Sequence, residues 1–188
     1  MKPRLSQLLA MAPAALAAIT PMSAGAAAVD YFLKIDGIEG ESADKAHSKE
    51  IQLDTFSFAA SQSSLAVVGP GGGGSAGKAS FADTTVTAKL SKASPNLYYG
   101  AATGTHFKSA VISARRSGDK NPTDFYTVKL EDIVISSVKT AGTIADGPGE
   151  TVTMNFSKVT WSYRPQKPDG TLDAAVTRFW SLKESKGG

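Results

Sequence analysis

The chain has 188 residues, of which 41% are hydrophobic and 20% are charged, and these values fit one globular domain with a substantial core. It contains no cysteine, so disulfides, thiolate metal sites and cysteine nucleophiles are excluded. No apolar run reaches the roughly 18–20 uninterrupted residues of a membrane span. Stability must therefore come from packing, with association between subunits as a second source.

Residues 1–26 contain the three regions of a secretory signal peptide in the right order. Two cations precede the apolar run 5–19, and the segment ends in Ala24-Gly25-Ala26, which fits the small-residue rule for cleavage. We therefore predict a signal peptide at 1–26, followed by a single domain at 27–188. The alternative is that translation starts at Met22, so that the leader is not part of the protein.

The predicted leader accounts for most of the basic character of the chain. It holds two of the 20 basic residues and none of the 17 acidic ones, so its removal lowers the net charge from +3 to +1. Arg115-Arg116 is the only adjacent basic pair. Nucleic-acid binding needs a basic face with stacking aromatic residues, and the sequence predicts none.

From Val29 onward, stretches rich in β-branched and aromatic residues alternate with turn residues such as Asp36-Gly37. This pattern is typical of an all-β domain. The predicted strands are Tyr31–Ile35, Glu50–Gln62, Ser80–Leu90, Lys108–Arg116, Asp124–Lys139, Glu150–Tyr163 and Ala175–Lys183.

The apolar alternation changes phase inside the long strands. One face carries the apolar residues from Val152 to Phe156, and the opposite parity carries those from Val159 to Tyr163. An inserted residue near Ser157-Lys158 explains this shift, as in a β-bulge, and Ile51 to Phe58 shows the same pattern. Repeated bulges in long strands favour a coiled sheet that closes into an antiparallel β-barrel.

One helix interrupts the strands. Ser94 is a good N-cap, and Pro95 suits the first helical position. Leu97 to Ala102 favour helix, and Gly104 can adopt the left-handed conformation that ends one. The pattern predicts a helix of about two to three turns that connects or plugs the barrel.

The glycine-rich segment Gly72–Lys78 satisfies only the first part of a nucleotide-binding P-loop. Ala79 replaces the hydroxyl residue that would hold magnesium, and a strand follows where a helix would be needed. We therefore predict no cofactor. A loop this rich in glycine cannot pack by itself, so we expect it to become ordered against a partner.

The other chemically interesting residues form no recognisable site. His47 and His106 are the only histidines, and neither has the spacing of a metal site, so we predict surface or turn histidines. The acidic residues of the first loop lack the order of a calcium loop and are expected to be solvated. Ser57 lacks the context of a nucleophile. We therefore predict no catalytic residue and no metal ligand.

Several separated segments resemble, in order and spacing, one known family. They are Ala28–Ile35, Gly40-Glu41-Ser42, His47, Glu50-Ile51, Ser61-Gln62-Ser63, Gly71–Lys78, Lys92–Leu97, Arg115–Gly118 with Asn121-Pro122, Leu130–Val138, Val152–Phe156 and Tyr163–Gly170. Together they resemble Hcp, the haemolysin-coregulated tube protein of type VI secretion systems. The resemblance covers nearly all of the chain after the leader.

The resemblance implies a β-barrel with one helix that assembles into a six-membered ring without enzymatic activity. In that family the rings stack into a tube, which a contractile sheath propels out of the cell with small effectors in its bore. The implied partners are further copies of the chain, effectors, and the sheath and spike proteins.

Two groups of residues are assigned roles in such a tube. We expect the glycine-rich loop to contact the next ring, and its residues are Gly69, Pro70, Gly71, Gly72, Gly73, Gly74, Ser75, Ala76 and Gly77. Thr55 and Ser57 alternate with Phe56 and Phe58, so they face outward if the aromatic side chains fill the barrel. We predict that Thr55 and Ser57 line the bore, the alternative being a plain solvated face.

The predicted leader departs from the family pattern, because tube proteins are normally assembled in the cytoplasm. A cleaved leader implies a secreted or periplasmic protein, whereas a start at Met22 implies a cytoplasmic protein before secretion. A second hypothesis follows, in which the chain is an exported β-barrel module that binds a small ligand or glycan.

Overall fold

The computed structural model describes residues 28–62, 79–117 and 123–188 of the chain. Strands dominate, and the described residues contain one α-helix. The elements in chain order are β1 (Val29–Ile35), β2 (Ile51–Ser57), β3 (Ala60–Gln62), β4 (Ala79–Phe81), β5 (Thr84–Lys89), α1 (Ser94–Thr103), β6 (His106–Arg116), β7 (Asp124–Thr143), β8 (Gly147–Asn155), β9 (Lys158–Tyr163), β10 (Val176–Ser181) and β11 (Lys186–Gly187).

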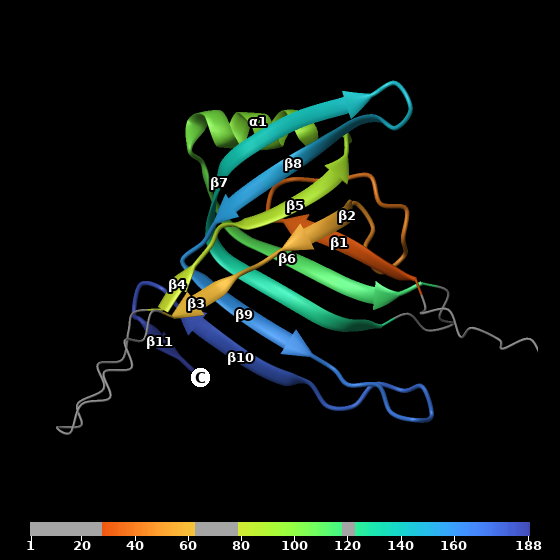
Figure 1. Ribbon diagram of the computed structural model, residues 1–188, viewed down its shortest axis with the longest axis vertical. Helices are drawn as coiled ribbons and strands as arrows, with labels where there is room; N and C mark the ends of the chain where they lie inside the picture. The colour runs from red at the N-terminus through yellow and green to blue at the C-terminus, as the bar shows by residue number, and fades with distance from the viewer. Residues whose placement is uncertain (1–27, 63–78, 118–122) are drawn as a thin grey trace, which may run out of the picture.

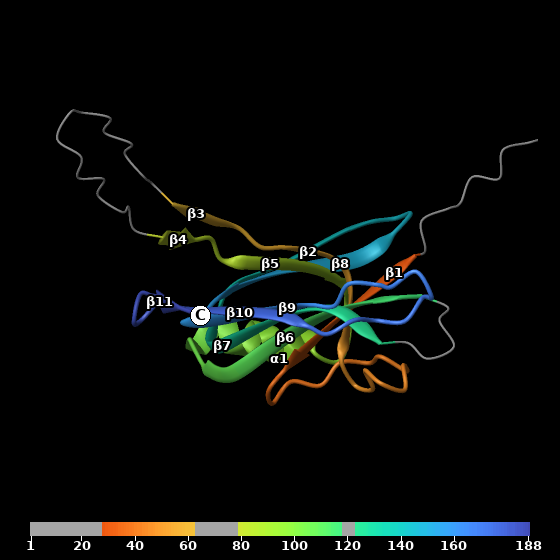
Figure 2. The ribbon, with the colours of Figure 1, turned by 90° about the horizontal axis from the view of Figure 1, so that it is seen from below.

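Six strands close into an antiparallel barrel, as the sequence predicts. Neighbouring strands follow the order β7, β6, β1, β2, β5 and β8, and β8 pairs again with β7. The barrel is flattened, with β2, β5 and β8 in one layer and β6 and β7 in the other (Figures 1 and 2). Closure leaves no free edge within the barrel itself.

The predicted phase shifts are real. In β2 the register slips between Leu53 and Thr55, as expected from its apolar pattern. Where β8 gives way to β9, the pairs Val134–Asn155 and Glu131–Lys158 keep one register, yet Leu130 and Ile133 are both buried, as are Phe156 and Val159. Both strands therefore carry the irregularity that the sequence predicts for one of them. Asp132 lies in it with φ 53°, a left-handed conformation uncommon for aspartate.

Three predicted strands are wrong in one respect, because each is divided, and Glu150–Tyr163 is divided into β8 and β9 at the irregularity described above. Glu50–Gln62 is split into β2 and β3, and Ser80–Leu90 into β4 and β5. The outer parts of these two, β3 and β4, pair only with each other and leave the barrel as a two-stranded ribbon (Figure 2). Alternation continues through Phe58 and Phe81, so the sequence gives no signal where the chain changes partner.

Strands β9, β10 and β11 form a flange that extends the β7 side beyond the barrel (Figure 1). β10 therefore does not complete the barrel, and the short β11 follows it at the edge. Phe81 of the ribbon packs over the flange, with its ring centroid 6.2 Å from that of Trp161 and 6.3 Å from that of Trp180. These aromatic contacts hold the ribbon against the flange.

Apolar side chains from every barrel strand and from α1 fill the interior. Leu33, Ile112, Leu130 and Met154 are fully buried at the centre of this core. Leu97 enters it from the helix, which packs against β7. The alternation of apolar and polar residues thus places one face of each strand in a single core, as expected for a barrel.

Helix α1 spans Ser94–Thr103, close to the predicted range, but its predicted N-cap is wrong. The Ser94 hydroxyl makes no cap bond within the helix and instead accepts a hydrogen bond from the Ser91 backbone N–H at 3.0 Å. Ser91, in the turn before the helix, accepts a hydrogen bond from the Ala93 N–H through its Oγ. Gly104 ends the helix in the predicted left-handed conformation. Within the described residues no helix is long and apolar enough to span a membrane.

Glu150 of β8 is an isolated carboxylate, 3% exposed, with no hydrogen-bond partner for either oxygen among the described residues. Burial raises its pKa, and the nearby Ser94 hydroxyl opposes part of this shift. The folded state thus binds the proton more tightly than the unfolded state does. The ionised carboxylate therefore destabilises the fold fully above the raised pKa, and this destabilisation is absent below the ordinary pKa of glutamate.

We expect Glu150→Gln to increase the free energy of unfolding by about 1 kcal/mol at neutral pH, measured by urea denaturation. An unchanged or lower stability would contradict this expectation.

Candidate functional site: an outward hydroxyl face

One layer of the barrel presents hydroxyl side chains to solvent. Register pairing aligns Ser57 with Thr85, Thr153 and Ser137, and Thr55 with Thr87 and Thr151. Each of these residues has at least one chain neighbour, such as Phe56, Val86 or Val152, that packs in or against the core, so these side chains point outward. We call the following set the hydroxyl face: Thr55, Ser57, Thr85, Thr87, Ser137, Thr151 and Thr153.

The structure places both predicted bore residues on this face. Thr55 and Ser57 are exposed, while Phe56 between them packs against the core. The Thr55 and Thr87 hydroxyl oxygens are 2.7 Å apart, which indicates a hydrogen bond across the strands. Lys139 follows Thr151 in the same row. A surface of small hydroxyls offers neither an apolar anchor nor a deep pocket, so its contacts with another protein would be individually weak.

Asp83 fixes the lower border of the hydroxyl face, at the junction between ribbon and barrel. Its Oδ2 accepts a hydrogen bond from the Ser136 hydroxyl at 2.7 Å, and its Oδ1 accepts one from the Asn155 amide at 2.9 Å. Ser136 lies at the register shift of β7. This aspartate therefore holds the start of β5 to its neighbour β8 and to β7 beyond it, where β4 departs.

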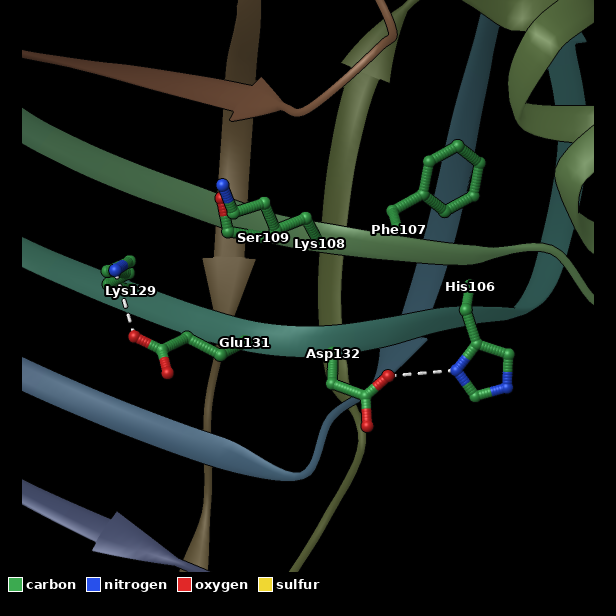
Figure 3. Close-up of a pocket in the computed structure, with 7 residues that line it drawn as sticks. All are labelled: His106, Phe107, Lys108, Ser109, Lys129, Glu131 and Asp132. Carbon is green, nitrogen blue, oxygen red and sulfur yellow. Dashed lines mark hydrogen bonds and ion pairs between the residues drawn. The ribbon is translucent and has the colours of Figure 1, made fainter.

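A pocket of about 620 Å³ lies on the opposite layer, against β6 and β7. Figure 3 shows Asp132 directed toward His106 at its rim. His106 Nδ1 is 2.9 Å from Asp132 Oδ1, and the Ser157 hydroxyl donates to Asp132 Oδ2 at 3.1 Å. In a catalytic triad the histidine lies between serine and aspartate, whereas here the aspartate is central. Ser157 thus gives its hydrogen bond to a carboxylate and has no activating base in this arrangement.

The carboxylates near this pocket are held in their charged form. Lys183, His106 and Ser157, in that order, keep the pKa of Asp132 well below its usual range. The hydrogen bond from Lys129 is the largest cause of the lowered pKa of Glu131. Lys129 Nζ lies 2.8 Å from Glu131 Oε1. These exposed ion pairs satisfy one another, which is typical of a solvated charged surface.

The structure reveals a buried charged cluster that the sequence does not predict. His47, predicted to be a surface or turn histidine, lies in a turn but is only 6% exposed, and it contacts Glu50 and Asp124. Asp44, expected to be solvated, forms a bidentate ion pair with the buried guanidinium of Arg115. The one signal of this cluster in the sequence is Phe32, an apolar residue at an outward position of β1. An apolar side chain there needs another segment of the chain to cover it.

Residues 32–163 match the family model described as "Type VI secretion system effector, Hcp". The chain is 36% identical over 160 residues to Protein hcp1 of Pseudomonas aeruginosa, and the match covers 84% of this chain and 98% of that protein. The chain belongs to the Hcp family. The fold and family that the sequence resemblance implied are therefore confirmed.

Solved Hcp structures share the arrangement of this barrel. A structure described as a type six secretion system protein is similar with a TM-score of 0.79 and 30% identity, and covers 86% of this chain and all of its own. Hcp1 from Salmonella typhimurium gives a TM-score of 0.70 at 30% identity, covering 86% of this chain and 99% of that one. The Hcp barrel thus accounts for nearly all of the described residues.

Two predictions for this Hcp chain fall on residues outside the described ones. The loop assigned to ring stacking, Gly69 to Gly77, belongs to the segment 63–78 between β3 and β4, which the structure does not describe. The predicted signal peptide at 1–26 likewise precedes the first described residue. Both remain predictions from the sequence.

Proposed function

We propose that this protein is an exported structural subunit whose hexameric rings stack into a type VI secretion tube that carries effectors. Membership of the Hcp family is the observation that carries the proposal. The placement of Thr55 and Ser57 on a continuous hydroxyl face supports it. A structural rather than enzymatic role is further supported by the Ser157–Asp132–His106 order, which leaves the serine without a base.

The hydroxyl face is the surface we assign to the bore. Four strands, β2, β5, β8 and part of β7, present it in register, so six copies arranged in a ring would line a channel with small polar groups. Such a wall binds a passing protein weakly and releases it easily, as transport requires. The opposite layer, with its ion pairs around Asp132 and Glu131, would then face the sheath.

The remaining parts of the proposal concern export and assembly. We assign Gly69–Gly77 to contacts between stacked rings and 1–26 to a cleaved leader, with effectors, sheath and spike as partners. A protein with this leader works outside the cytoplasm, whereas a start at Met22 gives secretion through the tube alone. N-terminal sequencing of the extracellular protein distinguishes these routes. The glycan-binding alternative has no support from the family relationship.

Ring formation is the first expected result. The free edges of the ribbon and of β11 can pair with other chains, and head-to-tail contacts between identical subunits close into a ring with cyclic symmetry. Light scattering on residues 27–188 should give the mass of a hexamer. A monomer whose mass does not change with concentration would contradict the proposed assembly.

The bore assignment predicts that Ser57→Arg retains the ring and loses effector binding. The exposed position tolerates the larger side chain in the subunit, but a bound effector would bury an unpaired guanidinium against the wall. We expect retention of a co-purified effector to fall about tenfold or more, measured by quantitative pull-down. Thr177→Arg adds the same charge to an exposed position on the flange and should change nothing. Collapse of the ring in Ser57→Arg would place Ser57 in an interface instead.

A further inference from the structure

Phe32 lies on the outer surface of the barrel yet is buried. Its neighbours Leu33 and Ile35 belong to the core, and Phe32 pairs across the sheet with Gln52 and Ser113. Only 2% of Phe32 is exposed. The loop of residues 36–50, drawn in orange beside β1 and β2 in Figure 1, supplies its cover.

The side chains of His47 and Arg115 contact the Phe32 ring. The His47 ring stacks on it with centroids 4.2 Å apart and planes 6° apart, and the Arg115 guanidinium carbon lies 4.9 Å from its centroid. Arg115 belongs to β6 and holds Asp44 of the loop in a bidentate ion pair. Asp44 Oδ1 also accepts the backbone N–H groups of Ala46 and His47, which shapes the turn that carries the imidazole.

Both nitrogens of the His47 ring face a carboxylate. Nδ1 is 2.8 Å from Glu50 Oε2 of the same loop, and Nε2 is 2.9 Å from Asp124 Oδ1 of β7. An ionised carboxylate only accepts hydrogen bonds, and a neutral imidazole has one N–H donor and one lone pair. A neutral ring would therefore set one lone pair against a carboxylate, whereas an imidazolium satisfies both contacts.

We propose that His47 is held as an imidazolium and that its second proton fastens the loop over Phe32. Loss of that proton leaves either Glu50 or Asp124 facing a lone pair in a buried position. The loop then loses either its hydrogen bond to β7 or the Glu50 contact that holds the imidazole in place, so it loosens from the barrel and uncovers Phe32. The loop is thus a proton-controlled cover on the outer wall of the barrel.

The charges around His47 set the range in which the cover is closed. Asp44 and Glu50 face the cluster from the loop, Asp124 from β7, Arg115 from β6 and Asp30 from β1. The Arg115 hydrogen bond keeps the pKa of Asp44 well below its usual range, so this ion pair is lost only in strong acid. The His47 contacts are present while the imidazolium persists and are lost as the pH rises.

The proton count is tested directly by long-range ¹H–¹⁵N NMR of the imidazole nitrogens in the protein of residues 27–188. His47 should show two protonated ring nitrogens at neutral pH. His106, exposed and with one carboxylate partner, provides the reference in the same spectrum. A single protonated nitrogen on His47 at neutral pH would overturn the proposal.

Hydrogen exchange tests the movement of the loop. The Gly40 and Lys49 N–H groups bond inside the loop to Lys49 O and Ser42 O, and they should lose protection about tenfold or more at a pH that deprotonates His47. Glu50→Gln provides an amide that can donate to a neutral Nδ1, so this alkaline loss should disappear. Glu184→Gln removes the same charge from an exposed turn and should retain it. Equal behaviour of the two variants would contradict the mechanism.

Discussion

Replacing Arg115 with alanine is expected to lower the free energy of unfolding by about 3 kcal/mol, because it breaks a buried ion pair and leaves Asp44 without its partner. The guanidinium also packs over Phe32, so the variant loses a contact with the ring. Urea denaturation monitored by circular dichroism measures the change. This substitution should destabilise the fold more than any other single change of a charged residue discussed above.

The neighbouring arginine provides the matched control for this variant. Arg116 is half-buried and lies 5.9 Å from the Phe125 ring without a paired acid in the cluster, so Arg116→Ala should cost less than about 1 kcal/mol. The lowered pKa of Asp44 means that the ion pair stabilises the fold above the ordinary pKa of aspartate and that this effect is lost as the pH falls. Equal losses for both arginine variants would show that the ion pair contributes no net stability.

Deletion of Gly71–Ala76 is expected to abolish ring stacking while changing the free energy of unfolding by no more than about 0.5 kcal/mol. The deletion lies within the connection between β3 and β4, so both strands keep their pairing and Phe81 of β4 keeps its contact with the flange. Shortening a long connection between two paired strands costs little, whereas losing the segment assigned to the neighbouring ring removes that contact altogether. Electron microscopy of tubes and thermal melting of rings give the two measurements.

A variant of equal length distinguishes the effect of the glycine content of the loop from the effect of its length. Replacing Gly72 and Gly74 with serine keeps the number of residues and should retain stacking if the loop acts through its length. Tubes that persist after the deletion would show that the rings stack through other surfaces. An unfolded barrel after the deletion would show that the segment belongs to the fold.

The sequence predicts the barrel because its interior is built from alternating apolar residues, interrupted by a few phase shifts. Residues such as Val86, Val128 and Val152 show which face of each strand is buried, and the phase shift at Leu53 shows where the ladder slips. The outward placement of Thr55 and Ser57 follows from the same alternation. Gly104 identifies the end of the helix because few other residues adopt its left-handed conformation easily.

What the sequence does not predict depends on contacts between distant segments. Asp44 and Arg115 are 71 residues apart, and His47 and Asp124 are 77 apart, so no local pattern brings them together. The division of β2 from β3 is hidden for a related reason. Phe58 continues the alternation, but its ring contacts Phe81 of the ribbon and Trp161 of the flange as well as Phe156 of the core.

The irregularity at Asp132 has a consequence for variation in the length of the chain. Opposite it lies Ser157, and each strand carries its additional residue at the same rung of the ladder. Removing a residue from one strand alone would leave the other with an unmatched one, whereas removing one from each restores a continuous hairpin with the same residues inward. Insertions and deletions at this site should therefore be tolerated only in opposed pairs, and the direction in which the flange leaves the barrel should change with each pair.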